Sequence, residues 1–214
     1  MTQILKLHPT HPQRRLLRRA AEILREGGVI AYPTDTCYAL GCAVGDAAAA
    51  QRIRRLRGVD ERHHLTVVCR NVAEVGRFAR MDNTQFRIVK RGSNGAFTFL
   101  VRATPEVPRR VQHPKRSTVG IRIPHHPAVL ALLDELAEPV LSSTLLLPGD
   151  SEPLHDPGEI AMRLGDRVNA ILDASTSGTI STTVIDLTTE PPTVVRRGLG
   201  DPAALGIEEV GQFG

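Results

Sequence analysis

The stretch AYPTDTCYALGCAV, residues 31–44, joins two apolar runs through the short polar segment Pro33-Thr34-Asp35-Thr36. The apolar residues at 29–32 and 38–44 predict two β-strands, and proline and aspartate bend the chain between them. A turn does not require two hydroxyl groups around one carboxylate. Thr34 and Thr36 are therefore candidate binding residues, with a structural role in the turn as the alternative.

Helices are predicted on both sides of this stretch. Apolar residues at helical spacing predict a helix over 13–26, which a preceding proline opens and a glycine pair closes. Asp46 is expected to cap a helix that ends near Arg57. Asn71 and Asn83 are expected to cap two short helices further along the chain.

The remaining apolar runs predict a series of short strands with helices between many of them. These strands are expected at 65–69, 97–101, 118–123, 140–144, 169–174, 182–187 and 192–197, and further helices at 127–136 and 156–164. This order predicts an α/β fold of the α+β type, a mixed sheet with flanking helices in one domain. The domain is expected to span residues 1–200, followed by an irregular tail over 201–214.

The composition is that of an ordinary globular protein. The 214 residues are 41% hydrophobic and 23% charged, which is enough for a sizeable core. No apolar run reaches the roughly 18 residues of a membrane span, and the first residues do not form a signal peptide. The three cysteines adjoin apolar runs and are expected to be free thiols, which predicts a cytoplasmic location.

Charge is distributed unevenly along the chain. Residues 77–116 carry ten lysines or arginines against two acidic residues, whereas residues 134–166 carry eight acidic residues against one arginine. A basic face suits a polyanion such as a nucleotide or RNA, and a solvated face without a partner is the alternative. Aromatic residues make up only 3% of the chain, which argues against recognition of single strands by base stacking.

Hydroxyl groups and arginines recur where predicted strands end. The hydroxyl clusters are at 34–36, 142–144 and 181–183, and the arginines are Arg122 and Arg196. Such groups hold carboxylates and phosphates at strand-end loops. Phosphate-binding glycine loops and zinc-protease motifs are absent, so we expect no metal site and assign no catalytic residue. Cys37 is interpreted as a buried thiol rather than a nucleophile, and the paired histidines at 63–64 and 125–126 as poor chelates.

Several motifs in this order resemble the YrdC/YciO family, and most of all its YciO branch. They are GGVIAYPTDTCYALGC, NGAFTFLV, TVGIRIPHHP, PVLSST, TTVIDLT and VVRRG, and the similarity extends over residues 1 to about 200. The resemblance implies a twisted mixed sheet around a large concave cavity. It also implies a nucleotidyltransferase-like activity, L-threonylcarbamoyladenylate synthesis from ATP, bicarbonate and L-threonine, with Mg²⁺ accompanying ATP as substrate and no tightly bound cofactor. The product of such enzymes serves tRNA modification.

The resemblance also assigns residues to the two substrates. For the amino acid or its carbamate it implies Thr34, Thr36, Arg122 and Thr182. For the nucleotide it implies Arg57, His63, Thr118, Thr144 and Arg196. These are the partners that we expect, a nucleotide and a small amino acid, and the sequence leaves the oligomeric state open.

Four positions depart from the synthases of this family. Val59 and His63 stand where the synthases carry an arginine and a lysine, and Val68 and Leu146 replace a histidine and an asparagine. The lost polar contacts predict altered or weakened synthase activity. Related members bind double-stranded RNA, so an RNA- or tRNA-binding protein without catalysis is the alternative.

Overall fold

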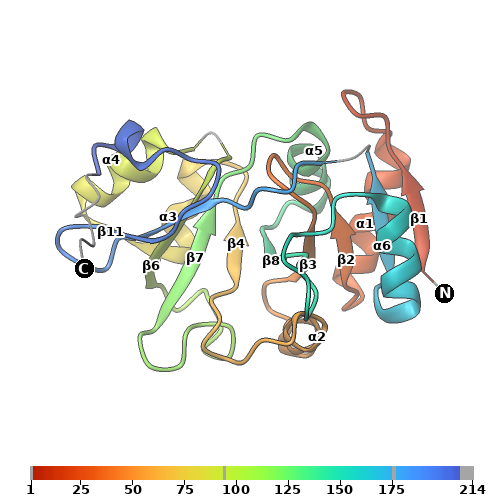
Figure 1. Ribbon diagram of the computed structural model, residues 1–214, viewed down its shortest axis with the longest axis horizontal. Coiled ribbons are helices and arrows are strands. Elements are labelled where there is room, and N and C mark those ends of the chain that lie inside the picture. Colours follow the sequence, from red (N-terminus) through yellow and green to blue (C-terminus); the bar gives the residue numbers. More distant parts are fainter. Residues whose placement is uncertain (1, 94, 175–176, 208–214) are drawn as a thin grey trace.

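The computed structural model describes residues 2–93, 95–174 and 177–207. Within these ranges, its centre is one twisted mixed sheet with the strand order β1-β9-β2-β3-β8-β4-β7-β6-β10-β11, and β5 pairs with β6 (Figure 1). The strands are β1 Gln3–Lys6, β2 Ile30–Tyr32, β3 Ala39–Ala43, β4 Thr66–Val68, β5 Ala79–Arg80, β6 Phe97–Ala103, β7 Thr118–Arg122, β8 Val140–Thr144, β9 Ala170–Asp173, β10 Thr183–Asp186 and β11 Thr193–Arg196. The α/β class with a mixed sheet is therefore confirmed.

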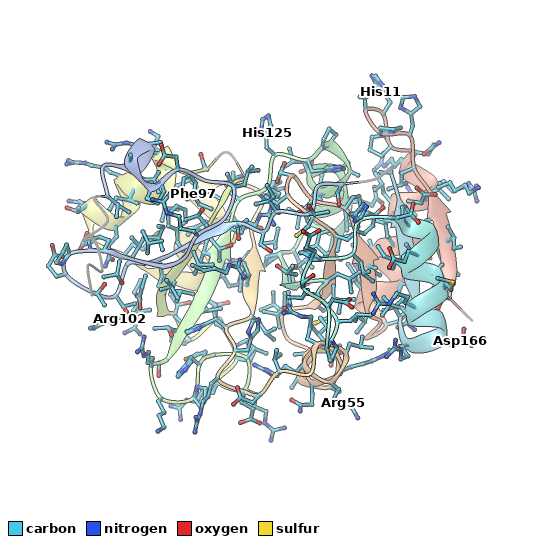
Figure 2. The ribbon with its side chains drawn as sticks, viewed as in Figure 1. His11, Arg55, Phe97, Arg102, His125 and Asp166 are labelled. Atoms are coloured by element: carbon cyan, nitrogen blue, oxygen red, sulfur yellow. The ribbon has the colours of Figure 1, made fainter. Side chains whose placement is uncertain are left out.

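The helices flank this sheet. They are α1 Arg14–Arg25, α2 Ala47–Arg57, α3 Val72–Phe78, α4 Asn83–Arg91, α5 Pro127–Leu136 and α6 Pro157–Leu164, with short 3₁₀ helices at Gly165–Arg167 and Pro202–Leu205. Among the described residues, every helix is too short or too polar to cross a membrane. Charged side chains project outward from this framework, as Arg55, Arg102 and Asp166 show in Figure 2.

One face of the sheet is covered at one end by α1 and α5. These helices bury an apolar stripe against Ile30 and Tyr32 of β2 and Val140 of β8. Glu135 on α5 accepts hydrogen bonds from Arg14 and Arg18 on α1, which fixes the two helices side by side. The neighbouring residues on the same strands point to the opposite face because side chains alternate along a strand.

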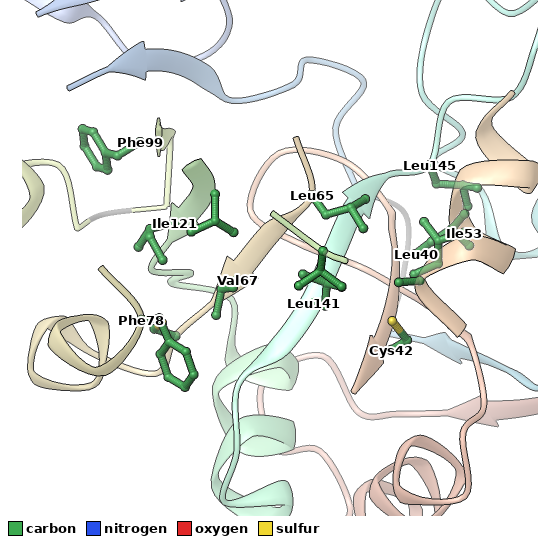
Figure 3. Close-up of a cluster of buried hydrophobic side chains, with 14 of the residues drawn as sticks. Leu40, Cys42, Ile53, Leu65, Val67, Phe78, Phe99, Ile121, Leu141 and Leu145 are labelled. Atoms are coloured by element: carbon green, nitrogen blue, oxygen red, sulfur yellow. The ribbon is translucent and has the colours of Figure 1, made fainter. Parts of the chain in front are cut away.

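The opposite face carries the main core, which is shown in close-up in Figure 3. Ile53 of α2 shares this core with Leu40 of β3, Leu141 of β8 and Leu65, which directly precedes β4, and all four side chains are fully buried. Phe99 and Ile121 extend the same layer over β6 and β7. Since this face is filled by the core, a ligand site on the sheet has to lie on the face of α1 and α5.

Two local expectations are corrected by the structure. The cap of α4 is Asp82, whose carboxylate accepts from the Gln85 backbone N–H at 2.8 Å, so Asn83 is the first helical residue and not the cap. The expected irregular tail begins with the 3₁₀ helix at Pro202–Leu205, and Leu205 and Ile207 are buried in the main core. The rest of that tail, 208–214, lies outside the described residues.

Candidate functional site

A cavity of about 240 Å³ lies on the face of the sheet that the main core does not fill. Along β6, Phe97 and Phe99 enter the core, whereas Thr98 and Leu100 line the cavity. β4 alternates in the same way, since Thr66 and Val68 line the cavity and Val67 enters the core. Further lining residues come from β3, β7, β8, β10 and β11, so polar side chains gather on one surface. The charged or polar lining residues are Arg62, His63, His64, Thr66, Thr98, Arg122, Ser142, Ser143, Thr144, Thr182 and Arg196.

This lining is cationic. Arg62, Arg122 and Arg196 are all present, and none of the described lining residues is aspartate or glutamate. The described part of the chain also contains no cluster of side chains that could hold a metal ion. Such a lining favours an anionic ligand, since a low-dielectric wall strengthens the field of each guanidinium.

Arg122 lies at the end of β7, and hydrogen bonds to the turn at 33–36 hold its side chain in place. Its Nη2 donates to Asp35 Oδ2 and to Thr36 Oγ1, both at 3.2 Å. Asp35 in turn accepts from the His125 backbone N–H at 3.0 Å. The residue is 8% exposed, and its Nε is buried without a hydrogen-bond partner among the described residues. Arg122 is therefore oriented by the protein, and it forms part of the cavity lining.

Thr34 plays a different part from Thr36. The Thr34 hydroxyl donates to the Cys37 carbonyl at 2.6 Å and accepts from the Thr36 backbone N–H at 3.3 Å. It also lies 3.2 Å from Thr36 Oγ1. These bonds satisfy Thr34 within the turn, so Thr34 shapes the loop while Thr36 contacts Arg122.

Arg57, at the end of α2, points toward the cavity wall and forms hydrogen bonds with neighbouring residues there. Its Nε donates to the Leu146 carbonyl at 2.7 Å, and its Nη1 donates to Ser143 Oγ and to the Thr144 carbonyl at 2.7 and 2.6 Å. Burial, followed by the field of the nearby Arg196, lowers the pKa of Arg57 to about 10. Arg57 thus shapes the segment after β8, and it is not among the residues that line the cavity.

Arg196 and Thr182 form the wall on the side of β10 and β11. Arg196 Nη2 donates to the Thr182 carbonyl at 2.9 Å, and Thr182 Oγ1 lies 2.8 Å from Thr98 Oγ1. Burial lowers the pKa of Arg196. Both acceptors of Arg196 are uncharged, so its positive charge is not neutralised by a carboxylate in these bonds.

Two histidines complete the wall near β4. Burial, followed by the field of Arg57, lowers the pKa of His63 to about 4, and burial together with His113 lowers that of His64 to about 4. His64 Nε2 lies 2.8 Å from Thr118 Oγ1, and its ring stacks on that of His113. Both imidazoles are therefore neutral at pH 7 and serve as hydrogen-bonding groups there.

The expected site residues fall into two groups. The first group lines the cavity and consists of His63, Arg122, Thr144, Thr182 and Arg196. The second group lies directly behind lining residues and consists of Thr34, Thr36, Arg57 and Thr118. Their roles in binding stay predictions. Thr66, Thr98 and Asp35 also belong to the site or its support but are not among the residues predicted from the sequence. For Thr98 a local signal exists, because a hydroxyl between two apolar residues, as in Phe97-Thr98-Phe99, indicates that one face of the strand is polar.

Comparison with known proteins places these features in a family. The family model for Sua5, YciO and YrdC, described as "Telomere recombination", matches residues 22–198. YciO of Escherichia coli K12 is 46% identical over 201 residues, covering 94% of this chain and 98% of YciO. The crystal structure of E. coli YciO superposes with a TM-score of 0.93 at 45% identity over 96% of this chain and all of that one.

More distant relatives carry a described activity or ligand. A threonylcarbamoyl-AMP synthase of Halorhodospira halophila is 30% identical over 183 residues, covering 85% of this chain and 90% of that protein. The structure of Pyrococcus abyssi Sua5 complexed with L-threonine gives a TM-score of 0.85 at 26% identity. That match covers 92% of this chain and 58% of the Sua5 chain.

Proposed function

Because the chain belongs to the Sua5/YciO/YrdC family, we propose that it binds a nucleotide and an amino acid or its carbamate in the cationic cavity. We further propose an altered or weakened threonylcarbamoyladenylate synthase activity. The observation that supports this most strongly is Arg122, which is nine-tenths buried, fixed by Asp35 and Thr36, and part of the cavity lining. A guanidinium held in this way is suited to receive the carboxylate of an amino acid.

In this reaction the threonine amine and bicarbonate form a carbamate with loss of water, and the carbamate and ATP then give the adenylate and pyrophosphate. A carbamate oxygen attacks the α-phosphate, and the bond to pyrophosphate breaks. Arg62 and Arg196 would offset the negative charge of the leaving pyrophosphate. The cavity walls would shield the mixed anhydride from part of the solvent. Mg²⁺ would enter with ATP because the described lining offers no carboxylate. The cytoplasm and tRNA modification are the setting that this proposal implies.

The reduction in activity follows from the contacts around Arg57. Three of its five N–H donors are used within the protein, at Ser143, Thr144 and Leu146, so fewer donors remain for a phosphate. Val59 has no charge to contribute. The loss of each charge-assisted hydrogen bond costs about 1.5–3 kcal/mol, or roughly one to two decades in affinity.

Calorimetric titration with ATP, AMP and L-threonine tests the binding, and release of pyrophosphate with formation of the adenylate tests the chemistry. Arg122→Ala should lose the heat of threonine binding, whereas Arg102→Ala, an exposed arginine at the far end of β6, should bind like the wild type (Figure 2). If no heat is released by any of the three ligands at millimolar concentration, the proposal is wrong.

An RNA-binding role without catalysis is the second candidate, favoured by an open groove beside the 104–117 loop. The groove is lined by Arg80, Arg109 and His113, among others, and exposed basic side chains surround it. Binding of duplex RNA should weaken steeply with salt because phosphate contacts release counterions. Arg109→Ala should reduce the salt slope relative to the wild type, and an affinity that does not change with salt would exclude this role.

A further inference from the structure

Thr66 of β4 carries a hydroxyl group that is free on the cavity side of the sheet. Two other hydroxyls of the lining are bonded within the protein, since Ser142 Oγ accepts from the Tyr32 hydroxyl and Ser143 Oγ accepts from Arg57, both at 2.7 Å. Thr66 Oγ1 has no hydrogen-bond partner among the described residues, and it is not one of the buried unpaired polar atoms. Its O–H donor therefore faces the space of the cavity.

The neighbouring strand leaves room for this hydroxyl. Thr66 pairs with Gly120 of β7, and a Cβ at Gly120 would lie 2.7 Å from Thr66 Oγ1. The hydroxyl therefore leans over the position that a side chain at 120 would fill, on the face of the sheet that the cavity occupies. A larger residue at 120 would displace the hydroxyl, so the glycine keeps the donor open to the cavity.

Thr66 lies between the two ends of the proposed site. In the parallel pairing of β4 with β7, Val68 is opposite Arg122, so Thr66 precedes the strand position of Arg122 by two residues, or about 7 Å. In the other direction, His63 and His64 of the lining lie just before β4. The carboxylate of an amino acid at Arg122 and a nucleotide at the histidines would leave the group that joins them over Thr66.

The charge of the lining disfavours a free amino acid. A free amino acid carries an α-ammonium group, and the described lining holds three arginines but no carboxylate that could pair with this cation. Reaction of the amine with bicarbonate forms an N–C bond, breaks a C–O bond of bicarbonate and releases water, while the proton of the ammonium goes to the solvent. The product is a carbamate anion, which suits a cationic lining.

We infer that Thr66 is a further binding residue of the cavity and donates its hydroxyl hydrogen bond to a carbamate oxygen of an N-carboxylated amino acid. The inference rests on the proposed function, because it takes the carboxylate of the same ligand to bind at Arg122. The ligand class is then the carbamate, which the site binds more tightly than the free amino acid. Thr66 holds the carbamate on the side of the cavity floor from which its oxygen reaches the nucleotide.

Calorimetric titration with L-threonine and with N-carbamoyl-L-threonine, in buffer free of bicarbonate, tests the inference. The carbamoyl compound lacks the ammonium group and has a carbonyl oxygen where the carbamate has an oxygen, so the wild type should bind it more tightly than L-threonine. Thr66→Val keeps the shape of the side chain but removes the donor. It should bind the carbamoyl compound about threefold to tenfold more weakly and L-threonine like the wild type. Added bicarbonate should tighten threonine binding by the wild type but not by Thr66→Val.

Two variants serve as controls. Thr66→Ser keeps the hydroxyl and should retain the preference for the carbamoyl compound, and Thr193→Val, at an exposed threonine of β11 outside the lining, should bind both ligands like the wild type. The inference alone is wrong if Thr66→Val weakens both ligands equally or neither, or if the wild type binds L-threonine as tightly as the carbamoyl compound. A wild type that binds neither ligand would refute the proposed function and this inference together.

Discussion

Replacing Arg122 by methionine separates the two tasks of this side chain, holding the turn and receiving a ligand. The ion pair with Asp35 spans 3.2 Å, and the two side chains are 10% and 16% exposed. Removal of one member of a buried pair costs about 3–5 kcal/mol. We expect the lower end for the free energy of unfolding, about 3 kcal/mol, because Asp35 keeps the His125 N–H donor.

The effect on binding comes from the part of the guanidinium that the protein leaves free. Loss of a charge-assisted contact to the threonine carboxylate costs about 1.5–3 kcal/mol, so Kd should rise by roughly one to two decades. Urea unfolding gives the first quantity and calorimetric titration with L-threonine gives the second.

The double variant Asp35→Asn/Arg122→Met is the control that distinguishes misfolding from a lost contact. Removing both charges leaves no isolated buried carboxylate, so it should recover part of the stability without recovering threonine binding. If Arg122→Met folds and still binds L-threonine with the wild-type Kd, Arg122 is not the carboxylate receptor.

Three further predictions concern the framework and its pH response. Gly120→Ala should destabilise the fold by about 1–3 kcal/mol in urea unfolding, since its Cβ would lie 2.7 Å from Thr66 Oγ1 on the cavity face; an unchanged midpoint would contradict this. Asp82→Ala should lower the free energy of unfolding by about 1 kcal/mol through loss of the α4 cap, while Asn83→Ala should be nearly neutral. If Asn83→Ala is the more destabilising change, Asn83 is the cap. The folded-state pKa of His63, about 4, lies below its usual 6.5, so the unfolded chain binds the extra proton and stability is lost as pH falls from 6.5 toward 4. His63→Gln should reduce the change of the unfolding free energy across this pH window by up to about 3 kcal/mol. If the pH dependence of the unfolding free energy does not change, the pKa of His63 is not lowered in the folded state.

The sequence by itself determined the local elements, because their signals lie within a few residues. Pro127 opens α5 and Asp46 caps α2 as predicted, since a cap satisfies the N–H groups of the adjacent turn. The Asn83 cap was wrong for the same local reason, because Asp82 next to it accepts better and pairs with Gln85. Strand β1 was not predicted, since its four residues gain their pairing only from β9, far along the chain.

Only the tertiary structure decided which polar residues meet. Thr36 and Arg122 are 86 residues apart in sequence, and the tertiary structure places the turn against the end of β7, where the two side chains form a hydrogen bond. The family resemblance implies that Arg57 contacts the nucleotide, and only the tertiary structure shows that packing of α2 against the end of β8 gives this side chain three acceptors within the protein.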